Sequence, residues 1–186
     1  MLGLSGRMHY LMGDTPQPLP RFTAALALAN VRHGNINATP ESAVCIEFQP
    51  VQRPDWFPPH PRRPREGTPE PVNPPTGREV IADFNSESGW NDQSAGVRSK
   101  SLVGETMKLT VWQLSSGPGV HAGIPGPAVE RFFLVVYGSA TISEGPTRRE
   151  LGRETLAITS PSARGVTLQA TPGGGAVVAV YESLPR

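Results

Sequence analysis

The chain has 186 residues, enough for one well-buried core, and its net charge of +1 gives no electrostatic sign of nucleic-acid binding. It is low in hydrophobic (37%) and charged (18%) residues and rich in proline (21) and glycine (20), which favours a loop-rich β protein over a helical bundle. A single cysteine excludes an internal disulfide, and no stretch approaches the roughly 18 apolar residues of a membrane span. We therefore expect a cytoplasmic protein with no nucleic-acid or membrane partner.

The first 49 residues predict an N-terminal extension that packs on the rest of the chain or on a partner subunit. Residues 23–31 have a helical composition, but their near-alternation of leucine also suits a strand. Residues 43–48 are rich in β-formers and lie between Pro40 and Pro50, which predicts a strand.

Residues 50–78 hold 10 of the 21 prolines and predict an extended connector without regular structure. A proline-rich ligand for a recognition module is the alternative. Trp56 and Phe57 favour the connector, because exposed aromatic pairs are unfavourable and such residues usually fix a loop to a surface.

From residue 79 to 186 the pattern changes to short β-runs separated by Gly, Pro, Asn and Ser. Runs of this spacing favour an antiparallel sandwich or closed barrel. We expect a single jelly-roll barrel, with strands at residues 79–83, 107–114, 131–137, 139–142, 155–158, 166–170 and 176–181.

The run from Arg131 to Tyr137 is apolar at both alternating sets of positions. Because successive side chains of a strand point to opposite faces, this strand is expected to be buried on both. Either the N-terminal zone or a second subunit must then cover the outer face, and for this reason we expect a homodimer.

The order of these parts resembles the cupin superfamily over residues 105–182. A strand ends in Ser116-Gly-Pro-Gly119, His121 follows, and an aromatic-rich strand closes in Tyr137-Gly138-Ser139. Residues 151–161 and two more strands make a second unit. The resemblance implies an all-β, cupin-type jelly-roll barrel.

The metal-binding positions implied by the resemblance are mostly lost. In the family, the first unit carries His-x-His and then a Glu that is separated from a Gly by six residues, and the second unit carries a third His. Here His121 retains the first His, Gly123 and Gly165 stand near the other two, and Arg131 is separated from Gly138 by six residues. Arginine cannot ligate a cation, so we expect no bound metal and no cofactor.

The candidate site follows from these positions. Arg131 would hold an anionic or enolic oxygen of a substrate, His121 would act as a general acid or base, and Tyr137 would share the Arg131 face. Expected substrate-binding residues are Trp112, Gln113, Phe133, Val135 and Glu130. Two alternatives stay open: Arg131 pointing outward or pairing with Glu130 or Asp83, and Glu130 replacing it in the lumen.

Three functions are compatible with this pattern. The first is a metal-independent small-molecule enzyme, such as an isomerase, cyclase, epimerase, dehydratase or lyase, and the family resemblance suggests specialised metabolism. The second is a non-catalytic small-molecule-binding or regulatory module. The third is a metallo-cupin (Fe, Zn or Mn) oxygenase or lyase with unorthodox ligands drawn from His121, Glu130 and a histidine of the N-terminal zone.

Overall fold

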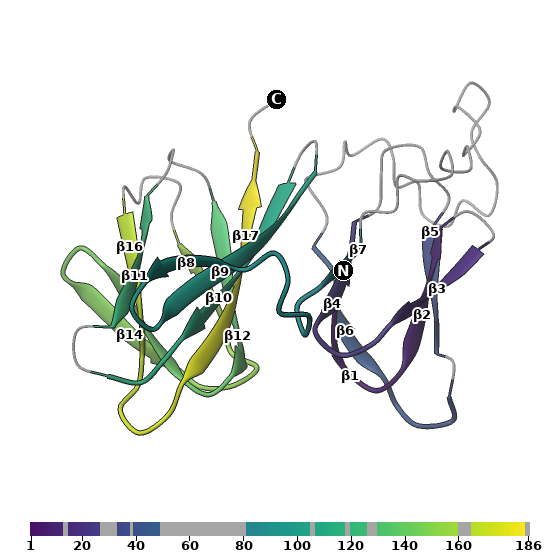
Figure 1. The fold of residues 1–186 in the computed structure, drawn as a ribbon, viewed down its shortest axis with the longest axis horizontal. Helices are drawn as coiled ribbons and strands as arrows, with labels where there is room; N and C mark the ends of the chain where they lie inside the picture. Colours follow the sequence, from purple (N-terminus) through teal and green to yellow (C-terminus); the bar gives the residue numbers. More distant parts are fainter. Residues whose placement is uncertain are drawn as a thin grey trace, which may run out of the picture. The chain divides into compact units, whose positions relative to one another are not determined.

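The structure is a computed structural model, and it describes residues 1–12, 15–26, 33–37, 39–48, 81–104, 107–117, 120–125, 130–159 and 165–184. All regular elements in these ranges are antiparallel β-strands, which confirms the all-β class (Figure 1). The predicted proline-rich connector at residues 50–78 lies outside the described residues. Nothing in the described ranges is a helix of the length and apolarity needed to cross a bilayer.

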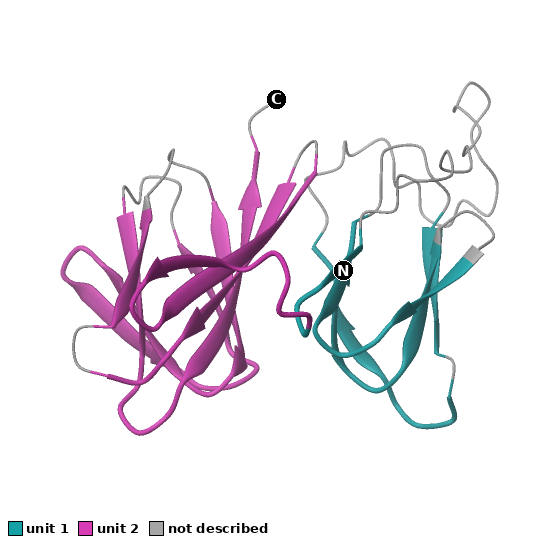
Figure 2. Ribbon diagram, viewed as in Figure 1, with its two compact units in different colours: residues 1–85 teal, residues 86–186 magenta. Residues whose placement is uncertain are grey.

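The chain divides into two compact units, Met1–Asn85 and Ser86–Arg186 (Figure 2). The strand expected to open the barrel at residues 79–83 appears as β7 (Ile81–Asp83). It pairs with β4 (Thr23–Ala25), so it belongs to the first unit rather than to the barrel. The region expected to be an extension therefore has sheets of its own.

The first unit contains a four-stranded and a three-stranded sheet, ordered β6-β1-β4-β7 and β3-β2-β5. Its small core includes Met8, Tyr10, Leu19 and Ala25, with Cys45 packed beside them. The remaining strands of this unit are β1 (Leu2–Ser5), β2 (Met8–Met12), β3 (Thr15–Leu19), β5 (His33–Asn37) and β6 (Val44–Ile46).

Tyr10 is a buried titratable residue of the first unit. Its hydroxyl has no hydrogen-bond partner within the described ranges, and burial, followed by the nearby Glu47 carboxylate, raises the pKa of Tyr10 to about 12. Since this lies above the ordinary value of 10.0, folding favours the neutral phenol. The contribution of Tyr10 to stability is therefore complete below pH 10 and is lost as the pH rises through about 12.

A spectrophotometric titration of the three tyrosines tests this assignment. Wild-type protein should show a tyrosinate phase near pH 12, and Tyr10→Phe should lack the contribution of one tyrosine to that phase. Circular dichroism at each pH confirms that the protein is still folded. An unchanged titration curve in Tyr10→Phe would contradict the assignment.

The second unit packs a six-stranded sheet, ordered β15-β12-β17-β10-β9-β8, against a four-stranded sheet, ordered β11-β16-β13-β14. Strands expected at residues 107–114 and 131–137 appear with those bounds. The strands of this unit are β8 (Asn91–Ser94), β9 (Val97–Val103), β10 (Met107–Leu114), β11 (His121–Pro125), β12 (Arg131–Tyr137), β13 (Ala140–Glu144), β14 (Thr147–Leu151), β15 (Leu156–Thr159), β16 (Gly165–Ala170) and β17 (Ala176–Ser183).

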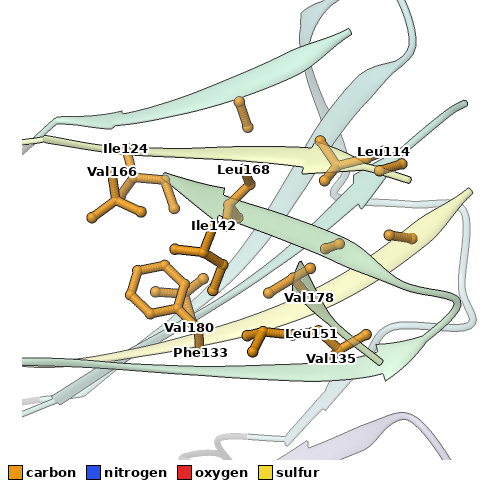
Figure 3. Close-up of a cluster of buried hydrophobic side chains, with 14 of the residues drawn as sticks. Leu114, Ile124, Phe133, Val135, Ile142, Leu151, Val166, Leu168, Val178 and Val180 are labelled. Carbon is orange, nitrogen blue, oxygen red and sulfur yellow. The ribbon is translucent and has the colours of Figure 1, made fainter. Parts of the chain in front are cut away.

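Strand alternation builds the core between these two sheets. Phe133, Val135, Val178 and Val180 of the larger sheet point toward Ile142 and other apolar side chains of the smaller one (Figure 3). Together with Leu114, Ile124, Leu151, Val166 and Leu168 they form one continuous cluster. This packing decides which side chains face the interior of the unit.

The opposite face of the larger sheet is also buried where β12 pairs with β17. Leu134 on β12 and Ala179 and Tyr181 on β17 alternate with core residues, so they point away from the core cluster, yet each is almost completely inaccessible. The prediction that strand 131–137 is buried on both faces is confirmed.

Candidate functional site

A row of polar side chains crosses the inner face of the larger sheet near one end. The register places Arg131 between Thr159 of β15 and Glu182 of β17, and Glu182 beside Lys108 of β10. These residues belong to the same alternating set as Phe133, Val180 and other core residues, so they share the inner face. The strand pairing thus gathers four polar side chains from distant parts of the sequence.

The centre of this row is a buried ion pair. Arg131 is 0% exposed, and its Nε donates to Oε1 of Glu182 at 2.8 Å. The side chain of Glu182 is 13% exposed, and Nζ of Lys108 lies 3.9 Å from its other carboxylate oxygen. Arg131 therefore points inward and pairs with the Glu182 carboxylate.

The inner face becomes apolar with distance from this row. Ser101 and Thr110 share a hydrogen bond of 3.0 Å one step further into the unit. Trp112 follows on the same face and packs against the core, with its buried Nε1 lacking a hydrogen-bond partner in the part of the chain that the structure describes. Leu114 continues the same face at the far end of β10.

A cavity of about 710 Å³ opens where the edge of one sheet faces the edge of the other. Its walls come from the β13–β14 hairpin, from β15 and from the first residue of β16. Glu144, Thr147, Arg149 and Thr159 supply polar groups, and Ile142, Pro146, Ala157 and Ile158 supply apolar ones. Because Thr159 is the cross-strand neighbour of Arg131, the cavity adjoins the polar row.

The polar groups of this cavity are available to a ligand. Glu144 and Arg149 form no ion pair with each other or with any other residue of the described ranges. Thr159 is 5% exposed, and its Oγ1 has no hydrogen-bond partner there either. Buried hydroxyls normally have a partner, and because Thr159 lines the cavity its hydroxyl is a candidate donor to a ligand.

The residues do not fit a metal site of the cupin type. His121 is exposed on the outer face, because its strand neighbours Ala122 and Ile124 fill the core. Gly123 and Gly165 offer no side chain, and the Arg131 guanidinium cannot ligate a cation. Among the described residues, no three His, Cys, Asp or Glu side chains lie close enough together to hold a metal ion.

The structure does not bring Arg131, His121 and Tyr137 together. His121 lies on the outer face, and Tyr137 is 55% exposed at the far end of β12, where the register shifts between Val135 and Tyr137. The expectation that Tyr137 shares the Arg131 face fails because this bulge breaks the alternation.

The expected substrate-binding residues are distributed differently. Trp112 faces the interior, and Phe133 and Val135 are fully buried core residues. Gln113 faces outward and accepts a hydrogen bond of 2.7 Å from Nε of Arg98. Glu130 is exposed immediately before β12. Of this set, only Trp112, Phe133 and Val135 face the interior.

Sequence reasoning missed Glu182, Thr159, Glu144 and Arg149. Glu182 continues the alternation of Val178 and Val180, which was a readable signal for the inner face. The two-residue turn Gly145-Pro146 sets Glu144 opposite Thr147 and Ile142 opposite Arg149.

Comparison with solved structures shows which known fold this chain shares. No protein family and no curated protein matches the sequence. AerE from Microcystis aeruginosa superposes with a TM-score of 0.63 and 16% identity, covering 99% of this chain and 76% of AerE. The second unit has a cupin fold.

Two other solved structures cover part of the chain. The Cnp3 cupin domain of Schizosaccharomyces pombe gives a TM-score of 0.47 at 13% identity and covers 58% of this chain and 76% of that domain. KdgF from Halomonas sp. gives a TM-score of 0.45 at 15% identity, and the match covers 55% of this chain and 94% of the KdgF chain. At these identities the likeness of this chain to its structural neighbours concerns the fold alone.

Proposed function

We propose that this cupin binds a small oxygenated molecule in the cavity between the β13–β14 hairpin and β15, and catalyses proton transfer on it without a metal ion. An isomerase, cyclase, epimerase, dehydratase or lyase reaction fits this description. The observation that carries the proposal is the lining of the cavity. It contains a carboxylate and a guanidinium that have no ion-pair partner in the described ranges, and it also contains a buried hydroxyl.

The chemistry follows from these groups. The Glu144 carboxylate takes a proton from a carbon next to a carbonyl group. The electron pair of the broken C–H bond forms a C=C bond while the π pair of the carbonyl group moves onto its oxygen, which gives an enolate. Arg149 and Thr159 donate hydrogen bonds that stabilise the negative oxygen. Return of the proton from Glu144 to a different carbon or face completes an isomerisation.

The buried Arg131–Glu182 pair supports the floor of this site. Glu182 is held by Arg131 and faces Lys108, so it is a positioning residue rather than a free base. The permanent charge of Arg131, at the position that corresponds to the metal-binding Glu of cupins, opposes a cation there. Among the residues described, proton transfer therefore falls to Glu144.

A non-catalytic binding module is the second candidate. The placement of His121 on the outer face favours it, since the expected pairing of a general base with Arg131 is not formed. Both candidates use the same cavity, and turnover separates them.

Hydrogen–deuterium exchange tests the proposal. The full chain, purified without a metal-binding tag, is incubated in deuterium oxide with phenylpyruvate or cyclohexanone, with and without EDTA. Protein-dependent exchange should persist in EDTA and should fall at least about tenfold in Glu144→Gln. Glu150→Gln, on the opposite face of β14, is the matched control and should exchange at the wild-type rate.

The other outcomes each reject the proposal in a distinct way. If EDTA abolishes the exchange, and the purified protein holds more than about a tenth of an equivalent of Fe, Zn, Mn or Ni, the protein is a metallo-cupin. If either compound binds but no exchange occurs, the result supports the non-catalytic binding module. Absence of both binding and exchange would show that the cavity is not the functional site.

A further inference from the structure

We infer that the ligand of this cavity is a small monocarboxylic acid whose carboxylate is held by Arg149 and Thr159. The inference deepens the proposed function and rests on it in taking this cavity as the ligand site: the carboxylate is the carbonyl group whose oxygen takes the enolate charge, so Arg149 and Thr159 have the same role in both. It moves the anion-binding role from Arg131, where the sequence pattern suggested it, to a different arginine on an edge strand.

Arg149 is placed for this role by the hairpin register. It lies opposite Ile142, a core residue, so its side chain leaves β14 on the inner face and lines the cavity. Arg148 is its neighbour in sequence and leaves the same strand on the opposite face. A guanidinium presents two parallel N–H donors that match the two oxygens of a carboxylate, and within the described ranges no carboxylate occupies those of Arg149.

Thr159 is the independent second observation. Its hydroxyl is buried in the wall of the cavity and lacks a hydrogen-bond partner in the described ranges. An unsatisfied buried hydroxyl is unfavourable, whereas a ligand oxygen that accepts its proton removes the penalty. Arg149 and Thr159 come from the edge strands of different sheets, so an oxygen between them is held from two sides of the cavity.

The remaining lining narrows the ligand class. Glu144 stands in the same cavity, so a dianion such as a phosphate monoester meets more repulsion than a singly charged carboxylate. Ile142, Ala157 and Ile158 give the cavity apolar walls, which suit a hydrocarbon or aromatic body attached to the carboxylate.

A matched pair of probes tests the inference on the full-length chain. Phenylacetate and phenylacetamide have the same shape and differ in charge, and phenyl phosphate adds a dianion. In ¹H–¹⁵N spectra, phenylacetate should shift amides of β13, β14 and β15 and bind at least about tenfold more tightly than the other two probes.

Four variants connect this preference to the residues. Arg149→Gln should lower the affinity for phenylacetate to that for phenylacetamide. Arg149→Lys keeps the charge but lacks the two parallel N–H donors of the guanidinium, so its affinity should be intermediate. Thr159→Val should lower the affinity for phenylacetate about three- to tenfold. Arg148→Gln should bind like wild type. The spectra also show that each variant is folded.

The results that would overturn the inference differ from those that would overturn the proposed function. If phenylacetamide or phenyl phosphate binds as tightly as phenylacetate, or if Arg149→Gln binds phenylacetate like wild type, the carboxylate assignment is wrong and the cavity remains a ligand site. If no probe shifts the amides of the cavity, the cavity is not a ligand site, and the proposed function is lost with it.

Discussion

Replacing Arg131 by methionine should lower the free energy of unfolding of the second unit by about 3–5 kcal/mol. The substitution removes a guanidinium that is 0% exposed and leaves the Glu182 carboxylate, 13% exposed, without its 2.8 Å partner. Lys108, at 3.9 Å from the other oxygen, compensates only in part. Urea denaturation can be followed by tryptophan fluorescence, since two of the three tryptophans, Trp90 and Trp112, belong to this unit.

A double variant separates the loss of the pair from the loss of packing. Arg131→Met combined with Glu182→Leu removes both charges, and it should recover most of the stability lost in the single variant. Glu130 precedes Arg131 in the sequence and is exposed, so Glu130→Gln should change the unfolding free energy by less than about 0.5 kcal/mol. A cost below about 1 kcal/mol for Arg131→Met would contradict a buried, paired guanidinium.

Gly138→Ala should destabilise the same unit by about 3 kcal/mol or more. Gly138 has a φ of +69°, and a Cβ at this position would lie 2.0 Å from the carbonyl oxygen of Gly175. Both elements are backbone, so the collision cannot be relieved by rotating a side chain. The result would explain why a glycine closes this strand of the cupin pattern.

Gly145→Ala is the matched control for this substitution. Gly145 also has a positive φ, +53°, but a Cβ added there would meet no atom of the described residues within 4 Å. Alanine there should cost only the left-handed backbone penalty of about 1 kcal/mol. Equal losses in the two variants, measured by urea denaturation, would show that the close approach to Gly175 contributes nothing.

The second unit was largely predictable because its strands are long and apolar. Residues 107–114 and 131–137 carry enough β-formers to define their ends, and spacing from Gly138 located Arg131 on the strand. Which face Arg131 uses was open from the sequence, because both faces of β12 are buried and alternation cannot distinguish two apolar faces.

The first unit was harder to predict because its strands are short and contain atypical residues. Strand β3 includes Pro16 and Pro18, which usually argue against a strand but are tolerated here at the edge of the β3-β2-β5 sheet. Strand β5, His33–Asn37, has the composition of a turn and is held by pairing with β2. Local propensity is overridden by sheet pairing in both cases.

The cavity could not be predicted because it depends on contacts between distant strands. Thr159 reaches it through the pairing of β15 with β12, and Arg149 through the hairpin that places β14 at the edge of the other sheet. His121 was misplaced for a related reason, since the face it uses is set by the packing of Ala122 and Ile124 rather than by its position in the motif.

The buried guanidinium of Arg131 also changes how the positive charge of this interior is supplied. A metal centre must be loaded after synthesis, competes with other proteins for its ion and is emptied by chelators. An arginine side chain is part of the polypeptide and stays charged at any pH at which proteins are folded. The positive charge of Arg131 at this end of the unit is therefore supplied by the polypeptide itself.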